Sequence, residues 1–242
     1  MNRKRRAAGE LARAGAWCAG CLRDRLATGL LAILTCLAVL ACKQAADTSK
    51  PVGQTPKTAL QASARSKSED SLVQQAASSC RQRIQEAARE HAADTKRVQE
   101  ASVLDMKEVT QREQLETKRA VVRSFQASNV TLKSLLVNEE AVFAEAMAKL
   151  DVPPARMQAE SKSFQSVIPN KAAAIRMREA EERIGNALLG ALGLLDEIWG
   201  QWSYNQDYGQ VQFSPPGALK RYNDLLEIIA AASREQEALQ EQ

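Results

Sequence analysis

The stretch "ALLGALGLL", residues 187–195, lies within the most regular apolar pattern of this sequence. Apolar residues recur on both sides of it at spacings of three and four: Met177, Ala180, Ile184, Leu188, Ala191, Leu195, Ile198 and Trp202. This spacing predicts a long amphipathic helix with Asn170 as its N-cap. Gly190 and Gly193 each cost about 1 kcal/mol relative to Ala inside a helix. We therefore expect a neighbouring helix to approach this face closely.

A second long helical region precedes it, because no Pro or Gly occurs between Leu72 and Leu150. Its later part carries an apolar stripe at helical spacing: Val122, Phe125, Leu132, Leu136, Phe143, Met147 and Leu150. One unbroken helix would be about 120 Å long. We expect a break near Asn129–Thr131, where cap-type and β-branched residues cluster. The helix should end at "DVPP", residues 151–154, since a proline disfavours helical backbone in the residue before it.

The region after the glycine-containing helix is rich in aromatic residues. Residues 203–217 show strand-like alternation and turn residues, and the last helix is expected at about 215–239. Six aromatic residues gather in this region: Trp199, Trp202, Tyr204, Tyr208, Phe213 and Tyr222. The fold class is therefore all-α: an elongated antiparallel helical bundle with long helices and a short extended aromatic turn before the last helix.

These aromatic residues have two interpretations. Buried rings would close the end of the bundle, whereas exposed Tyr and Trp side chains are typical of binding hot spots. We expect Trp202, Phe213 and Tyr222 to lie inside. Tyr204 and Tyr208 are expected outside, as candidate partner-binding residues.

The N-terminus has the pattern of a secretory signal. A basic start is followed by an uncharged apolar run at residues 26–41, which is shorter than the roughly 20 residues that span a bilayer. The four residues "VLAC" that end at Cys42 resemble a bacterial lipobox. That resemblance implies lipidation of the Cys42 thiol and cleavage after Ala41. The alternative is an uncleaved anchor helix that happens to end in cysteine.

This interpretation divides the chain into three parts. Residues 1–41 are the predicted lipoprotein signal peptide, and residues 42–65 are the lipidated cysteine and a disordered tether. Residues 66–242 form the predicted helical periplasmic domain, beginning at a capping box of Ser66 and Glu69. Lys43 follows the lipid-bearing cysteine and favours the outer membrane, facing the periplasm.

Charge and cysteine content exclude several classes of function. Seven of the 33 Lys and Arg residues and two of the 29 Asp and Glu residues precede residue 43, so the remainder carries a net charge of −1. We therefore expect no nucleic-acid partner. After the signal peptide only Cys42 and Cys80 remain, so a disulfide framework is excluded. Cys80 is expected to be buried or inert, with an intermolecular bridge as the alternative.

Motifs of catalytic chemistry are missing from the sequence. The only histidine, His91, has no second histidine or neighbouring cysteine, so it is expected to be a packed or solvated side chain. There is no G-x-S-x-G, no S-x-x-K and no glycine-rich phosphate loop. Glu139 and Glu140 are adjacent, and adjacent residues on a helix do not face each other. We expect no enzyme activity, no catalytic residue, no cofactor and no metal site.

Two segments carry a family resemblance. They are "EEAVFAEAMAKLDVPPARM", residues 139–157, and "YGQVQFSPPGALKRYNDLL", residues 208–226. Together they resemble the C-terminal half of the uncharacterised YiaF-like lipoproteins of Gram-negative bacteria. The residues that match the family motif are Gly209, Val211, Phe213, Tyr222, Asn223 and Leu225. The resemblance implies an all-helical periplasmic domain behind a lipobox, and it implies no catalytic residue.

The expected function is a membrane-anchored bacterial lipoprotein whose helical periplasmic domain is a non-catalytic structural or protein-interaction module of the cell envelope. Its expected partners are the membrane, through lipid on Cys42, and an envelope protein. A second copy of the chain is a further candidate. The alternative is a periplasmic inhibitor or immunity lipoprotein that neutralises a hydrolase.

Overall fold

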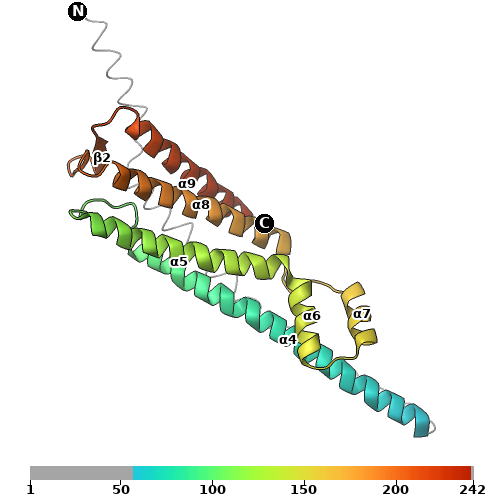
Figure 1. The fold of residues 1–242 in the computed structure, drawn as a ribbon. Coiled ribbons are helices and arrows are strands. Elements are labelled where there is room, and N and C mark those ends of the chain that lie inside the picture. The colour runs from blue at the N-terminus through green and yellow to red at the C-terminus, as the bar shows by residue number, and fades with distance from the viewer. Residues whose placement is uncertain (1–56, 241–242) are drawn as a thin grey trace, which may run out of the picture. The chain divides into compact units, whose positions relative to one another are not determined.

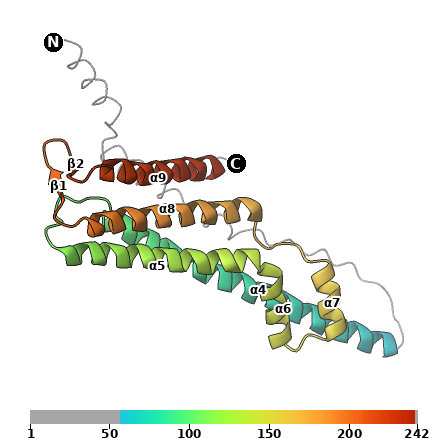
Figure 2. The same ribbon diagram turned by 45° about the horizontal axis from the view of Figure 1, so that its top comes forward.

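The computed structural model describes residues 57–240, with side chains from residue 68 onward, and it is all-α as predicted. Figures 1 and 2 show the helices and the small hairpin that this part of the chain contains. The elements are α4 (Lys57–Glu100), α5 (Arg112–Val137), α6 (Glu139–Lys149), α7 (Pro154–Lys162), α8 (Lys171–Glu197), β1 (Trp202–Asn205), β2 (Gln210–Phe213) and α9 (Ala218–Gln240). Within residues 57–240 no helix is long and apolar enough to cross a membrane.

The described chain divides into two compact units. The first unit comprises residues 94–126 and 180–240, and the second comprises residues 57–93 and 127–179. Each unit has its own cluster of buried apolar side chains.

The core of the first unit forms around the predicted stripe of α8. Its residues Ala180, Ile184, Leu188, Ala191, Leu195 and Ile198 are all buried. A Cβ atom added at Gly190 would lie 2.9 Å from Cδ2 of Leu225 on α9, which confirms the predicted close approach of a neighbouring helix. At Gly193 the nearest atom would be Nη2 of Arg119, at an ordinary contact distance of 3.7 Å.

The core of the second unit is built from α4, α5 and α6. The stripe residues Leu132, Leu136, Phe143 and Met147 are buried there beside Ala76, Cys80 and Ile84 of α4. The predicted stop at "DVPP" is confirmed, since α6 ends at Lys149 and Val152 turns inward with 3% of its surface exposed. The backbone of Asp151 takes the left-handed conformation, with φ of 54°, to make this turn.

The expected break near Asn129–Thr131 is wrong, because α5 runs through these residues. Both polar side chains find partners without disturbing the helix. The Asn129 amide donates to the carbonyl oxygen of Arg178 (2.9 Å), and the Thr131 hydroxyl donates to that of Ala127 (3.0 Å). Side-chain donors that are bonded in this way no longer compete with the helical hydrogen bonds, although Oδ1 of Asn129 is buried without a hydrogen-bond partner.

The long helical region is interrupted instead at residues 101–111. Ser102 has a φ of 42°, and Nζ of Lys118 donates to the carbonyl oxygens of Ala101 and Ser102 (3.0 Å each) where α4 ends. At the other end of the loop, Oε1 of Gln114 accepts hydrogen bonds from the backbone N–H groups of Thr110 (2.7 Å) and Gln111 (2.9 Å). Side chains of α5 therefore hold both ends of the loop.

Helix α4 also begins earlier than predicted. It starts at Lys57, so residues 57–65 are helical rather than part of the tether, and Ser66 lies inside the helix. The segment "KTALQASAR" explains this, because it contains good helix formers and neither Gly nor Pro. The predicted signal peptide, the lipobox and Cys42 lie outside the described residues.

Candidate functional site

The stretch that carries most of the predicted site residues forms a two-stranded antiparallel hairpin. Its register pairs Trp202 with Phe213 and Tyr204 with Val211. The tip is fixed by its own side chains: Oδ1 of Asn205 accepts hydrogen bonds from the backbone N–H groups of Asp207 (3.0 Å) and Tyr208 (3.3 Å). Such Asx turns hold a short loop in one backbone shape. Gly209 closes the tip with a φ of 61°, a conformation that glycine adopts without strain.

One face of the hairpin packs against the core of the first unit. Alternation along the strands places on this face Trp202, Tyr204, Val211 and Phe213. The indole N–H of Trp202 donates to the carbonyl oxygen of Leu195 (2.8 Å), and its ring meets Trp199 edge-on at 5.6 Å. The Phe213 ring lies 5.3 Å from the ring of Tyr222 on α9. The hairpin is therefore joined to both α8 and α9.

Tyr222 is the most deeply buried aromatic residue of this group, with 7% of its surface exposed. Burial raises the pKa of its phenol to about 12, because the phenolate would lose its hydration. Two other residues of the family motif follow on α9. Leu225 packs beside Gly190, whereas Asn223 is exposed.

The two tyrosines singled out as partner-binding candidates lie in different surroundings. Tyr208 is 70% exposed at the tip of the hairpin, as expected for a contact residue. Tyr204 is only partly exposed and packs against the core of the first unit, contrary to the expectation that it lies outside. Tyr208 is thus the aromatic side chain of the hairpin that is open to a partner.

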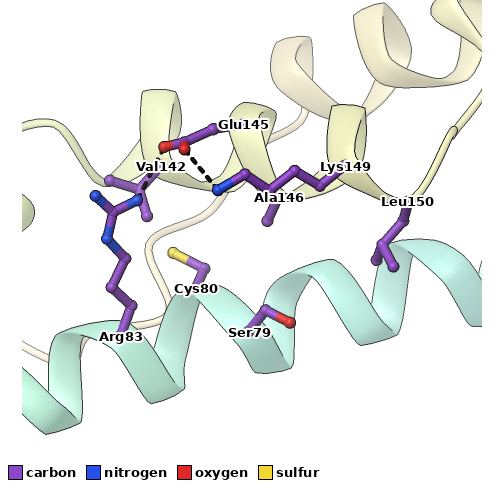
Figure 3. A pocket seen from close by; sticks show the side chains of 8 residues that line it. All are labelled: Ser79, Cys80, Arg83, Val142, Glu145, Ala146, Lys149 and Leu150. Atoms are coloured by element: carbon purple, nitrogen blue, oxygen red, sulfur yellow. Dashed lines mark hydrogen bonds and ion pairs between the residues drawn. The ribbon is translucent and has the colours of Figure 1, made fainter.

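The second unit contains a small pocket between α4 and α6 (Figure 3). It has a volume of about 140 Å³ and is lined by Ser79, Cys80, Arg83, Val142, Glu145, Ala146, Lys149 and Leu150. Glu145 accepts from Arg83 (2.9 Å) and Lys149 (2.8 Å), and these hydrogen bonds lower its pKa. The two cations at the rim are therefore already paired with a carboxylate.

Cys80 is buried, as expected, with 1% of its surface exposed. Burial is the main cause that raises the pKa of its thiol, and the negative charge of Glu139 raises it further. Its Sγ lies 3.8 Å from the backbone carbonyl oxygen of Glu139, which it approaches as a weak donor. A thiol with a raised pKa is a poor nucleophile at neutral pH, because the thiolate is the reactive form.

His91 is a packed histidine with 1% of its surface exposed. Its Nδ1 lies 3.1 Å from the hydroxyl oxygen of Ser128. Across the described part of the chain no three His, Cys, Asp or Glu side chains gather closely enough to hold a metal ion.

The structure also contains a polar site that sequence reasoning missed. In the sequence Glu139 stands out only as the neighbour of Glu140, yet its side chain is fully buried and binds Ser166, Val167 and Lys171. No local signal could have found this site, because the partners lie beyond the next helix in the sequence.

Comparisons with protein-family models, with curated proteins and with solved structures found no match to this chain. The resemblance to YiaF-like lipoproteins therefore stays a prediction.

Proposed function

We propose that this protein is a bacterial lipoprotein, anchored through lipid on Cys42 in the outer membrane and facing the periplasm. Its helical domain is a non-catalytic structural or protein-interaction module of the cell envelope. We also propose that the chain is a member of the YiaF-like family, and that its helices form one elongated antiparallel bundle with an aromatic turn.

The anchor is supported by the sequence "VLAC" after an uncharged apolar run. Each CH₂ group of an acyl chain that is buried in the membrane contributes about 0.8 kcal/mol of binding free energy, and more than one chain gives stable anchoring. The test is metabolic labelling with an alkyne fatty acid. The wild-type protein and a Cys80→Ser control should carry the label, and Cys42→Ser should lose it. A Cys42→Ser protein that is labelled as strongly as the control would refute the anchor.

The interaction role is supported by one observation, the exposure of Tyr208 on a hairpin whose backbone is fixed. A large side chain held on an ordered turn loses little conformational entropy on binding. Tyr is also among the residues that contribute most to binding energy at interfaces. The hairpin tip is therefore the proposed contact with an envelope protein.

A crosslinking pull-down with the tagged full chain tests this contact. Tyr208→Ala should reduce the captured partner about tenfold or more, because a hot-spot residue contributes about 2 kcal/mol or more. Leu219→Ala is the matched control, since Leu219 is also exposed (53%) and lies on α9 of the same unit. Equal capture by both variants would exclude the tip as the contact. Capture of a single hydrolase would favour the inhibitor alternative, for which a projecting hairpin is also suited.

A further inference from the structure

The connection between α6 and α8 differs from the rest of the second unit in its burial. None of the residues 153–169 is buried, although α7 lies within this segment. Each of the helices α4, α5 and α6, in contrast, contributes at least two buried apolar side chains to the core. Segments with few buried contacts are the ones that open locally, without unfolding of the whole protein. We call residues 153–169 the strap.

The strap is bracketed by two unusual backbone positions. Asp151 has a φ of 54° and Asn170 has a φ of 49°, and both are non-glycine residues. Residues with this left-handed conformation store a small amount of strain and are often sites where the chain changes direction. Between Asp151 and the strap, buried Val152 is anchored by a hydrogen bond from its N–H to the carbonyl oxygen of Met147 (3.1 Å). The two positions therefore mark changes of chain direction on either side of the strap.

A polar contact holds the C-terminal end of the strap. Glu139, the first residue of α6, has a fully buried side chain. Its Oε1 accepts the backbone N–H of Val167 (2.7 Å), and its Oε2 accepts the hydroxyl of Ser166 (2.6 Å). Nζ of Lys171, at the start of α8, lies 3.2 Å from the same Oε2. The buried carboxylate thus has donors from both the strap and α8.

Apolar contacts hold the strap against the same helix. The rings of Phe164 and Phe143 lie 5.4 Å apart, and Ile168 and Met157 are partly buried against the core of the second unit. Arg156 binds Asp70 on α4 (2.8 Å), in an ion pair whose two side chains are 37% and 49% exposed. Exposed pairs of this kind contribute little to stability.

Lifting the strap would not leave a charge stranded in an apolar environment. The carboxylate of Glu139 would exchange two strap donors for water, and its charge would gain hydration. A buried charge that loses its partners without access to water costs several kcal/mol, but a charge that becomes hydrated does not. The contact between Glu139 and the strap is therefore strong when closed and can be released without disrupting the core.

We infer that residues 153–169 form a strap that opens and closes over α6 as one unit, with Asp151 and Asn170 as its pivots and Glu139 as its latch. In the closed state the ring of Phe164 packs beside the ring of Phe143, which is 5% exposed. In the open state this apolar surface of α6 faces solvent while α4, α5 and α6 stay packed. The inference concerns only the second unit and does not depend on the proposed function.

Hydrogen–deuterium exchange of the full chain, followed by mass spectrometry, tests the inference. In the wild type, amides of α7 and of residues 163–168 should exchange faster than those of α6, by a route that low concentrations of urea do not accelerate. Glu139→Gln should speed exchange in the strap about tenfold or more, because hydrogen bonds to a charged acceptor are stronger than those to a neutral amide. Glu140→Gln is the matched control, since Glu140 is the exposed neighbour on the same helix.

A milder variant covers the case in which Glu139→Gln unfolds. Ser166→Ala removes one donor to Glu139 and keeps the charge, so strap exchange should rise severalfold while exchange in α6 stays unchanged. The inference is overturned if strap and α6 amides exchange at one common rate in the wild type. It is equally overturned if the variants speed exchange across the whole second unit by the same factor.

Discussion

The contact between α8 and α9 at Gly190 allows a sharp test of the packing. Gly190→Ala and Gly193→Ala make the same chemical change three residues apart in one helix. Each should gain up to about 1 kcal/mol of helix propensity, because glycine loses more backbone entropy than alanine on folding. The two positions differ only in their surroundings, so the difference between the variants measures the close approach.

The expected magnitudes follow from the space at each position. At Gly193 the new methyl group would lie 3.7 Å from Nη2 of Arg119, so the full propensity gain should appear. At Gly190 it would lie 2.9 Å from Cδ2 of Leu225, well inside the roughly 3.5–4.0 Å of a favourable carbon–carbon contact. Leu225 is partly buried and its Cδ2 is the end of a flexible side chain, so moving it aside should cost about 1 kcal/mol, the low end of the range for overpacking. We expect Gly190→Ala to be about 1 kcal/mol less stable than Gly193→Ala.

Urea denaturation of the full chain, followed by far-ultraviolet circular dichroism, measures this difference. Repeating Gly190→Ala in a Leu225→Ala background supplies the control, because the smaller side chain removes the clash. In that background the glycine substitution should stabilise by about 0.5–1 kcal/mol. Equal stabilisation by Gly190→Ala and Gly193→Ala in the wild-type background would refute the proposed contact between the helices.

Three further outcomes are expected. The phenol of Tyr222 should titrate near pH 12, as measured by absorbance at 295 nm. Because its pKa is raised in the folded state, the free energy of unfolding should be constant below about pH 10 and should fall by up to about 3 kcal/mol as the pH rises to 12. Tyr222→Phe should remove this fall. Phe213→Ala should cost about 1–3 kcal/mol of unfolding free energy, less than a fully buried ring because Phe213 keeps some exposure, whereas Tyr208→Ala should change it by no more than about 0.5. The hydrogen bond from Arg112 is the main cause that lowers the pKa of Asp196, so Asp196→Asn should destabilise at pH 7. The difference from wild type should shrink as the pH falls below the ordinary pKa range of aspartate and the folded carboxylate becomes protonated.

The fold was most predictable where one local pattern decides the outcome. The α8 stripe and the stop at "DVPP" each depend on residues within a few turns of one another. The close approach at Gly190 involves Leu225 of α9, but the glycines alone were enough to predict it. The burial of Cys80 likewise follows from an apolar residue type at a helical position. These features needed no knowledge of distant partners.

The features that sequence reasoning misplaced depend on distant partners. Asn129 appeared to be a helix breaker, but the carbonyl oxygen of Arg178, far along the chain, satisfies its amide. Tyr204 appeared to be a surface residue, but alternation in the hairpin turns it toward the core. The sequence predicts no role for Glu139, but its buried carboxylate accepts hydrogen bonds from Ser166 and Val167. Polar residues are hard to place from sequence because their burial depends on donors that only the tertiary structure supplies.

The loop of residues 101–111 has a kinetic consequence. Lys118 donates a hydrogen bond to Ala101 across a short loop. The C-terminal end of α4 and the N-terminal end of α5 can therefore meet at a small entropic cost of loop closure. Contacts of this kind form early in folding, whereas contacts between distant segments form late. The apolar side chains Leu115 and Val122 of α5, however, are covered by α8 and α9, which follow only from residue 171 onward. We therefore expect a helical hairpin of residues 94–126 to form first. One of its apolar faces should stay exposed to solvent until the C-terminal helices dock.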